Sequence, residues 1–324
     1  MFDDSIRTIG VLTSGGDAPG MNAAIRAVTR NALANGLEVR GIKRGFHGLL
    51  KEEVMVLNAR DVSDTLMRGG TFIQTARSKQ MMTKEGQVKA ASILNKFEID
   101  ALVVIGGDGS FKGAKALSEL GIKVICIPGT IDMDIACTEY TIGFDTAINT
   151  AMEAVDKIKE TSSSHERCSI IEVMGRNAGY IALWCGIATG AEKIFIPEVS
   201  RDIDKDALVE DILSHRGRKK NYTIINAEGV GHSTSLARYI EEKTGIETRA
   251  SILGYMQRGG SPTCTDRVYA SRMGALAVEL LLEGKYNRVI AVKDGAFVDY
   301  DIDEALGMEK SMPMDLYEMA SIIR

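Results

Sequence analysis

The sequence predicts an α/β protein with two doubly wound domains, each built on a mostly parallel sheet covered by helices. Strand-like runs rich in Val and Ile alternate with helical patterns almost throughout, and uninterrupted apolar strands are typical of sheets buried on both faces. The 33 glycines and only five prolines suit many short turns between strands and helices. A length of 324 residues is enough for two domains of about 150 residues each.

The elements follow one another as strand, turn and helix. The first strand is expected at Thr8 to Thr13, followed by a glycine-rich turn and a helix from about Met21 to Asn35. Apolar residues at helical spacing predict another helix over Phe144 to Lys159. Further strands are expected to start near Ala101, Val124, Ser169 and Tyr222, and a late strand to span Arg288 to Val292. Open sheets of this kind bind ligands at the carboxyl ends of their strands.

Composition narrows the class of protein. The residues are 45% hydrophobic and 26% charged, as in soluble globular proteins, and a net charge of −5 disfavours binding to nucleic acid or to anionic membranes. No run approaches the roughly 20 apolar residues of a membrane span, and the N-terminus lacks a secretory pattern. The five cysteines are odd in number and without CxxC spacing, so we expect reduced thiols in the cytoplasm, with Cys126, Cys168 and Cys185 in the core.

A glycine-rich turn, Ser14-Gly-Gly-Asp-Ala-Pro-Gly20, joins the first strand to the first helix. Backbone N–H groups and the helix N-terminus at such a turn form an anion site, although a tight turn that binds nothing fits the same residues. The chain has no GxxxxGK[ST] motif, and no GxGxxG closes a first βαβ unit. These absences argue against P-loop nucleotidases and ordinary dinucleotide dehydrogenases.

Two acidic motifs follow predicted buried strands. Gly106-Gly-Asp-Gly-Ser110 combines glycines that admit phosphate oxygens with Asp108, a carboxylate that can hold a divalent cation. Pro128-Gly-Thr-Ile-Asp-Met-Asp134 offers Asp132 as a base for a substrate hydroxyl. Each aspartate also fits a helix cap or a turn. Together, the two motifs favour phosphoryl transfer.

Arginines complete the pattern. Arg167, Arg176, Arg249 and Arg258 lie at predicted strand ends or glycine-rich turns, and the guanidinium fork matches phosphate oxygens. This arrangement suits a phosphorylated substrate, whereas an isolated arginine is usually a solvated surface group. Arg77 ends a glycine-containing turn that no convincing strand precedes. It is either an ordinary turn residue or a contact for the charge on a transferring phosphate.

With these residues assembled, the chain resembles the ATP-dependent 6-phosphofructokinases of the bacterial type, essentially from end to end. The motifs that carry the resemblance are Leu12 to Arg26, Gly106 to Ser110, Pro128 to Asp132, Thr161 to His165, Glu172 to Arg176 and Gln257 to Pro262. The resemblance implies transfer of a phosphoryl group from MgATP to O1 of fructose 6-phosphate in glycolysis. It also implies a nucleotide-binding domain at 1–141 plus 255–305 and a sugar-phosphate-binding domain at 142–254 plus 306–324.

The resemblance further implies residue roles. Asp132 would accept the proton of the sugar hydroxyl, supported by Thr130 and Asp134, while Arg77 and Arg176 offset charge and Asp108 binds Mg²⁺. ATP contacts would be Gly16, Arg77, Ser78, Gly107, Asp108, Gly109 and Ser110. Substrate contacts would be Thr130, Ile131, Asp132, Arg167, Met174, Gly175, Arg176, Glu228, Arg249, Tyr255 and Arg258. Arg167 and Arg249 would reach across a subunit interface, which implies a homotetramer.

The resemblance also bears on the phosphoryl donor and on regulation. Pyrophosphate-using relatives carry Asp and Lys where this chain has Gly109 and Gly129, so ATP is the expected donor. Allosteric nucleotide sites would map to Arg26, Arg30, Lys159, Gly190, Glu192, Lys219 and Lys220, with ADP and phosphoenolpyruvate as expected effectors. From the residues alone, these basic groups read as solvated helix faces.

Three departures from the family pattern remain. Met133 replaces a usual Asn, which removes amide hydrogen bonds from the loop around Asp132, and Tyr255 replaces a frequent His. The residues after Arg77 also differ from the usual sequence, which affects Ser78. The Met133 departure motivates an alternative hypothesis, a weakly catalytic sugar-phosphate or nucleotide sensor. A pyrophosphate-dependent kinase is the other alternative.

Overall fold

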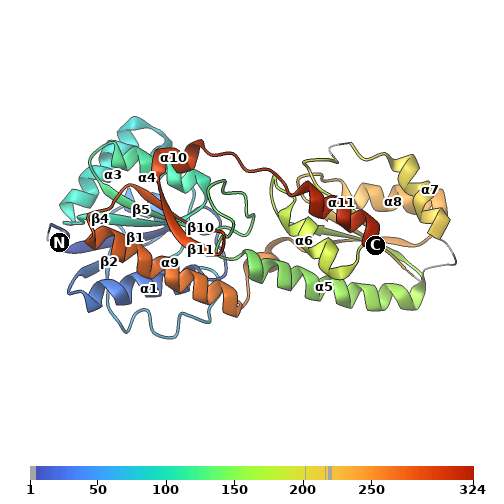
Figure 1. Ribbon diagram of the computed structural model, residues 1–324, viewed down its shortest axis with the longest axis horizontal. Coiled ribbons are helices and arrows are strands. Elements are labelled where there is room, and N and C mark those ends of the chain that lie inside the picture. The colour runs from blue at the N-terminus through green and yellow to red at the C-terminus, as the bar shows by residue number, and fades with distance from the viewer. Residues whose placement is uncertain (1–4, 201, 216, 218–220) are drawn as a thin grey trace. The chain divides into compact units, whose positions relative to one another are not determined.

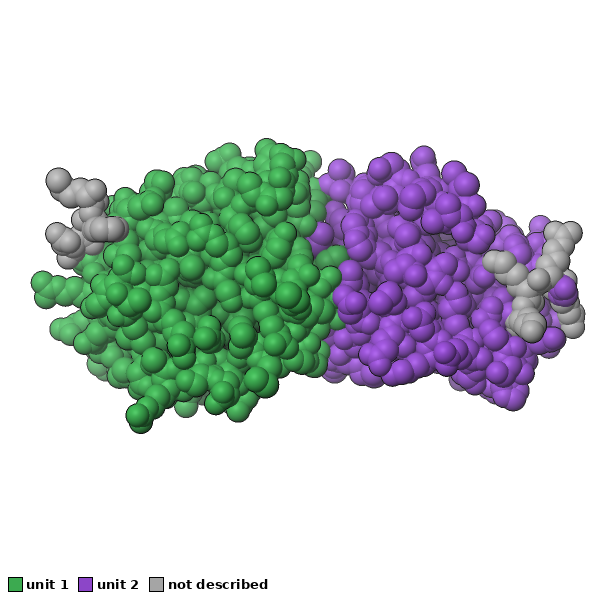
Figure 2. Space-filling model, turned by 60° about the horizontal axis from the view of Figure 1, so that its bottom comes forward, with its two compact units in different colours: residues 1–131, 135–146, 258–310 green, residues 132–134, 147–257, 311–324 purple. Residues whose placement is uncertain are grey.

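The computed structural model describes residues 5–200, 202–215, 217 and 221–324. The chain divides into two compact units (Figures 1 and 2). Unit 1 comprises residues 1–131, 135–146 and 258–310, and unit 2 comprises 132–134, 147–257 and 311–324. The stretch 132–134 clusters with unit 2, whereas the sequence prediction assigned it to the first domain. The ligand assigned to each part stays a prediction.

Unit 1 is built on a seven-stranded sheet in the order β11-β10-β5-β4-β1-β2-β3. The strands are β1 (Thr8–Ser14), β2 (Glu38–Ile42), β3 (Val54–Leu57), β4 (Ala101–Gly106), β5 (Lys123–Pro128), β10 (Arg288–Lys293) and β11 (Ala296–Asp301). All are parallel except β3 and β11, which pair antiparallel at the two edges. Ser14 pairs with Gly106 and Gly106 with Pro128, so β1, β4 and β5 end at the same level.

Helices cover both faces of this sheet. On one face, α1 (Met21–Ala34) and α9 (Cys264–Leu282) lie side by side; on the other lie α3 (Lys84–Lys96), α4 (Asp108–Ser118) and α10 (Ile302–Gly307) (Figure 1). Shorter elements are α2 (Gly45–Leu49) and the 3-10 turn η1 (Gln80–Met82). Every residue of β1 and β4 is buried, as uninterrupted apolar strands require. The predicted doubly wound architecture is confirmed for this unit.

Unit 2 has a fully parallel sheet in the order β7-β8-β6-β9. Its strands are β6 (Cys168–Val173), β7 (Lys193–Phe195), β8 (Tyr222–Ala227) and β9 (Thr248–Ile252). Its helices are α6 (Tyr180–Thr189), α7 (Lys205–His215), α8 (Ser233–Thr244) and α11 (Met314–Ile323), with the 3-10 turn η2 at Gly254–Arg258. α6 contacts β7 and β8, while α8 contacts β6 and β9 and packs on α7. A core of apolar side chains from β6, β8, α7 and α8 lies between strands and helices.

Helix α5 (Phe144–His165) starts within unit 1 and runs into unit 2 (Figure 1). Its first turn is held by Asp266 of α9, which is fully buried and accepts hydrogen bonds from the backbone N–H groups of Gly143 (2.6 Å) and Thr146 (2.8 Å). The hydroxyls of Thr146 and Tyr140 donate to the same carboxylate at 2.5 and 2.6 Å. The helix ends at His165 rather than at the predicted Lys159, so it includes the serine-rich segment that follows Lys159.

Candidate active site

Three glycine-containing segments leave the sheet of unit 1 at one edge. Because Ser14, Gly106 and Pro128 are paired, the turn after β1, the start of α4 after β4 and the loop after β5 all begin side by side. Gly107 lies close to Thr130, since a Cβ on Gly107 would be 3.9 Å from the Thr130 Cβ. The motifs at residues 14–20, 106–110 and 128–130 are therefore brought together, at the edge where parallel sheets bind ligands.

The turn after β1 is shaped for close approach by other groups. Gly15 and Gly20 have φ of +91° and +101°, conformations that favour glycine. The guanidinium of Arg258 lies against Gly16, where a Cβ would be 2.3 Å from Nη1, and Nη1 donates to the Asp17 carbonyl at 2.9 Å. Arg258, predicted to bind substrate, is thus held beside the turn predicted to bind nucleotide.

The segment carrying Arg77 docks on the same turn, although no strand leads directly into it: the described residues 58–79 contain no helix or strand. The Thr13 hydroxyl bonds with that of Thr71 at 2.9 Å and donates to the Gln74 carbonyl at 3.0 Å. The Thr75 hydroxyl donates to the Gly15 carbonyl at 2.9 Å. These bonds hold Thr75 against the glycine-rich turn, so the exposed side chain of Arg77 is two residues along the chain from that contact. These bonds could not be predicted from the sequence, because hydrogen bonds from a hydroxyl to a distant carbonyl have no sequence motif.

Asn22 of α1 completes this docking. Its amide nitrogen donates to the Arg68 carbonyl at 3.0 Å, and its amide oxygen accepts from the Phe72 N–H at 2.8 Å. Ser78, predicted to contact ATP, instead has its Oγ within 3.3 Å of the Met81 N–H, at the start of η1. Its hydroxyl therefore helps to form that turn.

Asp108 lies in the first turn of α4, with its side chain 52% exposed and 3.6 Å from Lys112 Nζ. The adjacent glycines leave the helix N-terminus open, and a Cβ on Gly109 would meet nothing within 4 Å. Within the described residues, no group of three or more metal-binding side chains forms. A single carboxylate beside a phosphate-accepting turn fits Mg²⁺, which usually takes one or two carboxylates and completes its shell with phosphate and water.

The loop after β5 holds Thr130 and Asp132 mostly buried, at 9% and 7% exposure. Gly129 bridges to Ile142, which anchors the start of the loop. Met133 has φ of +57°, a left-handed conformation that costs a non-glycine side chain about 1 kcal/mol or more. Burial raises the pKa of Tyr180, the first residue of α6, to about 12, and the charges of Glu198 and Asp134 add to this shift.

The carboxyl ends of β6 and β8 form a second cluster, in unit 2. The Arg176 N–H donates to Glu228 Oε1 at 2.7 Å, and the Glu228 N–H donates to the Val173 carbonyl at 2.8 Å. Gly175 and Arg176 have φ of +136° and +55°, which turns the chain sharply after the strand. The predicted substrate residues Met174, Gly175, Arg176 and Glu228 are thereby brought together.

Two other predicted substrate residues lie at the opposite end of this sheet. Arg167 immediately precedes β6, and Arg249 is the second residue of β9, where it pairs with Ser169. A strand of this length spans roughly 17–20 Å, so the whole of β6 separates Arg167 from Arg176, and most of β6 separates Arg249 from Arg176. Within unit 2, these arginines therefore do not join the cluster at Arg176 and Glu228. Tyr255 in η2 is 82% exposed.

Comparisons with known proteins agree with this geometry. A phosphofructokinase family model matches residues 8–281. The chain belongs to the phosphofructokinase family. An ATP-dependent 6-phosphofructokinase of Clostridium botulinum (strain Hall) is 56% identical over 319 residues, which cover 98% of this chain and 99% of that protein. That of strain Alaska E43 is 55% identical over the same length. The predicted family and kinase class are thus confirmed.

Solved phosphofructokinase structures share the fold. That from Saccharomyces cerevisiae has a TM-score of 0.86 at 36% identity, covering 97% of this chain; this chain spans only 47% of that longer one. A pyrophosphate-dependent phosphofructokinase from Marinobacter aquaeolei has a TM-score of 0.85 at 24% identity, covering 96% of this chain and 86% of that one. The second likeness concerns the fold alone. In the part of the chain that the structure describes, no helix is long and apolar enough to cross a membrane.

The predicted effector residues of this phosphofructokinase family member are split between the units. Arg26 and Arg30 lie on α1, where Arg30 donates to the Ala59 carbonyl at 3.4 Å. In unit 2, Lys159 Nζ donates to the carbonyls of Thr189 and Gly190, the latter at 3.5 Å. Lys219 and Lys220 lie outside the described residues.

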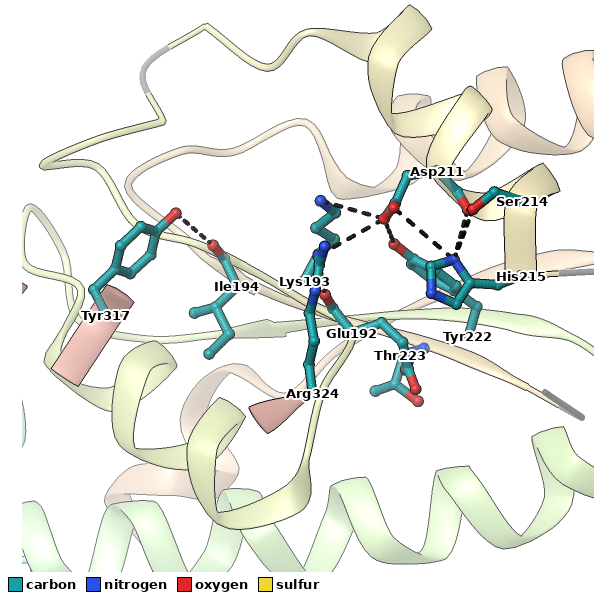
Figure 3. A network of polar contacts seen from close by, with 10 residues as sticks. All are labelled: Glu192, Lys193, Ile194, Asp211, Ser214, His215, Tyr222, Thr223, Tyr317 and Arg324. Atoms are coloured by element: carbon teal, nitrogen blue, oxygen red, sulfur yellow. Dashed lines mark hydrogen bonds and ion pairs between the residues drawn. The ribbon is translucent and has the colours of Figure 1, made fainter. Parts of the chain in front are cut away.

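Glu192, also predicted to bind effector, belongs to a polar network at one end of unit 2 (Figure 3). Its carboxylate accepts from the Thr223 N–H at 2.7 Å, and its carbonyl accepts from Arg324 Nη1 at 3.0 Å. Beside it, Asp211 contacts Tyr222 and lies 3.2 Å from Lys193 Nζ. Glu192 is therefore fixed in position by the backbone of β8 and by Arg324, which follows α11.

Proposed function

We propose that the protein transfers the γ-phosphoryl group of ATP to O1 of fructose 6-phosphate. The observation that carries this proposal is the common edge of β1, β4 and β5, where two glycine-rich turns, Asp108 and Thr130 converge. Curated relatives that are 56% identical over nearly their full length carry the same activity in their name. This similarity favours the kinase over the sensor and over the pyrophosphate-dependent enzyme. We place the reaction in glycolysis and the protein in the cytoplasm.

In this proposal each cluster has one task. The turns at Gly16 and Gly107 to Ser110 bind the triphosphate through backbone N–H groups, with Arg77 beside them. Asp108 would hold Mg²⁺, which offsets charge on the triphosphate when bound. Asp132 accepts the proton of the sugar hydroxyl, and Thr130 and Asp134 position the loop around it. Arg176 offsets charge on the transferring group, and Glu228 holds its backbone.

The choice of ATP over pyrophosphate is supported by the packing around Gly129. A Cβ at Gly129 would lie 3.0 Å from Ile105 Cγ2 and 3.1 Å from Met21 Cε, both in the core of unit 1. Lysine at this position, as in pyrophosphate-using relatives, would require these side chains to move. Gly109 is open, so an aspartate there would fit. Of the two glycines, only Gly129 therefore lies where packing disfavours the side chain found in pyrophosphate-using relatives.

Substitution of Asp132 tests the chemistry. Asp132→Ser should lower kcat by roughly 10²–10⁴-fold, the range for losing a general base, with little change in KM for either substrate. Asp294→Asn is the matched control, because Asp294 is exposed on the turn between β10 and β11. An unchanged kcat for Asp132→Ser would remove that residue from the role of base.

We further propose that the active enzyme is an oligomer, a homotetramer as in the family, in which Arg167 and Arg249 serve the site of a second copy. The support is their place at the end of the unit 2 sheet opposite to Arg176 and Glu228. At a sub-saturating concentration of fructose 6-phosphate, Arg167→Ala and Arg176→Ala should each lose most of the activity when expressed alone. Co-expressed, they should regain activity, because mixed oligomers contain sites made of unmutated residues from both chains. Failure of co-expression to restore activity, with mixed oligomers present by mass spectrometry, would contradict the shared site.

A further inference from the structure

Two arginines at the amino-terminal end of the unit 2 sheet share one carboxylate, that of Glu247. Glu247 Oε2 accepts from Arg167 Nε at 2.7 Å, and Oε1 accepts from Arg249 Nη2 at 2.7 Å and Nε at 3.1 Å. We propose that Glu247 is a positioning residue that holds Arg167 and Arg249 together as one phosphate-binding pair. The inference rests on the proposed function, which assigns both arginines to the sugar phosphate.

The geometry of the bonds favours positioning over competition. Arg167 meets Glu247 through Nε, so neither of its Nη atoms takes part in that bond. Arg249 uses Nε and Nη2, so its Nη1 takes no part either. Glu247 therefore binds Arg167 at Nε and Arg249 at the edge formed by Nε and Nη2. The remaining N–H groups of both arginines take no part in these bonds, and a planar guanidinium can bind a phosphate through them.

The backbone fixes all three residues at the start of two neighbouring strands, β6 and β9. The Cys168 N–H donates to the Glu247 carbonyl at 3.0 Å, and the register of β6 with β9 places Arg249 beside Ser169. The side chains themselves are partly exposed, at 29% for Arg167, 35% for Glu247 and 65% for Arg249. Long exposed side chains lose conformational freedom when they bind a ligand, and two guanidinium groups repel each other. A carboxylate between them reduces both costs before the phosphate arrives.

Charge supports the same conclusion. The hydrogen bond from Arg167 keeps the pKa of Glu247 below its usual range, so this side chain is ionised at neutral pH. The three groups together carry one net positive charge. A carboxylate that competed with the phosphate would bind the same N–H groups as the phosphate, and removing it would tighten substrate binding. Removing a positioning residue should instead weaken substrate binding, so the direction of the change distinguishes the two roles.

The test is steady-state kinetics of the full-length oligomer with ATP and fructose 6-phosphate. Glu247→Ala should raise the half-saturation concentration of fructose 6-phosphate about 10-fold, the effect expected when two side chains must be ordered on binding. The kcat and the half-saturation concentration of ATP should change less than about twofold, since a positioning residue for the sugar phosphate affects neither. A lowered or unchanged half-saturation concentration for fructose 6-phosphate would overturn the proposal.

Matched variants separate this role from general effects. Glu242→Ala removes the same charge from an exposed position on α8 and should leave kcat and both half-saturation concentrations unchanged. Glu247→Gln keeps the side-chain volume and one acceptor oxygen, so its effect should fall between the wild type and Glu247→Ala. In an Arg167→Ala background, Glu247→Ala should add less than it does alone, because the pair is already broken. Full additivity of the two substitutions would contradict the shared role.

Failure of this inference is distinguishable from failure of the proposed function. If Arg167→Ala and Arg249→Ala leave the half-saturation concentration of fructose 6-phosphate unchanged, the assignment of the arginines to the sugar phosphate is wrong. If these variants raise it but the Glu247 variants do not, only the positioning role fails. Sedimentation of each variant verifies that the oligomer is intact, so that a change in kinetics reports on the arginine pair.

Discussion

Replacing Asp266 with Asn is expected to destabilise unit 1 by about 3 kcal/mol, because this buried carboxylate organises the start of α5. One oxygen accepts from the Gly143 N–H and the Tyr140 hydroxyl, and the other accepts from the N–H and hydroxyl of Thr146. Each oxygen thus faces one backbone donor that cannot turn away. An asparagine amide has only one oxygen, so in either orientation its NH₂ group meets a backbone N–H.

The magnitude follows from that mismatch. A lost hydrogen bond to a charged group costs about 1.5–3 kcal/mol, and a buried unsatisfied donor costs about 1–3 kcal/mol. Relief of the cost of burying a charge offsets part of the sum, because burial raises the pKa of Asp266. Tyr140→Phe, which removes only one of the four donors, should cost about 1.5 kcal/mol, the lower end of the range for a hydrogen bond to a charged group.

Urea unfolding followed by circular dichroism, with hydrogen exchange at the Gly143 and Thr146 amides, measures both effects. The only tryptophan, Trp184, lies in unit 2, so its fluorescence reports on the other unit and should shift less. Asp294→Asn serves as the control for loss of one negative charge and should stay within about 0.5 kcal/mol of the wild type. Equal stability of Asp266→Asn and Asp294→Asn, with unchanged amide exchange, would show that Asp266 does not organise the start of α5.

Three further predictions concern the loop around the base, the acid response and the thiols. Met133→Asn should raise stability by about 1 kcal/mol, because Asn tolerates the left-handed φ better; a lowered urea midpoint would contradict this. Burial raises the pKa of Asp211, but hydrogen bonds from Tyr222 and Lys193 outweigh it, so the net pKa is lowered. Its contribution to stability is therefore present above about pH 4 and lost as pH falls through the lowered pKa, and the stability gap to Asp211→Asn should close in acid. Four of the five thiols are buried, so a thiol reagent at pH 8 should label the folded protein once, at exposed Cys264, and Cys264→Ser should abolish that reaction.

Buried thiols illustrate what composition alone could predict. Burial raises the pKa of Cys168 and Cys185 to about 12, in line with their predicted place in the core. Cys137, for which no such prediction was made, is also buried, and its pKa is raised to about 11. Cys126 is fully buried in β5, also as expected. A cysteine within a Val- and Ile-rich strand is buried together with that strand, so the apolar pattern was sufficient to predict its burial.

Strands with continuous apolar runs were equally predictable. β1 and β4 are buried along their whole length and β5 from its second residue on, and their apolar pattern located both the strands and the motifs that follow them. The antiparallel edge strands β3 and β11 were missed, because half-exposed edges lack that pattern. The last turns of α5 were missed because serine has weak helix propensity and packing decides its conformation.

Within the candidate site, the sequence found groups that follow strands and missed groups that act through tertiary contacts. Asp108 and Thr130 stand in motifs directly after β4 and β5. Asn22 and Thr75 hold the Arg77 segment through bonds to backbone atoms more than 40 residues away, and no local pattern announces such bonds. Glu247 was missed for the same reason, since a glutamate before a strand is ordinary until its two partners are known.

The most direct test of the central claim is a steady-state assay of the purified protein with fructose 6-phosphate and either ATP or pyrophosphate, with ³¹P NMR of the product. We expect turnover with ATP and Mg²⁺, formation of fructose 1,6-bisphosphate, loss of activity in Asp132→Ser, and at most trace turnover with pyrophosphate. Efficient turnover with pyrophosphate would contradict the assignment of ATP as the phosphoryl donor. Saturable binding of fructose 6-phosphate without turnover by either donor would contradict the kinase itself.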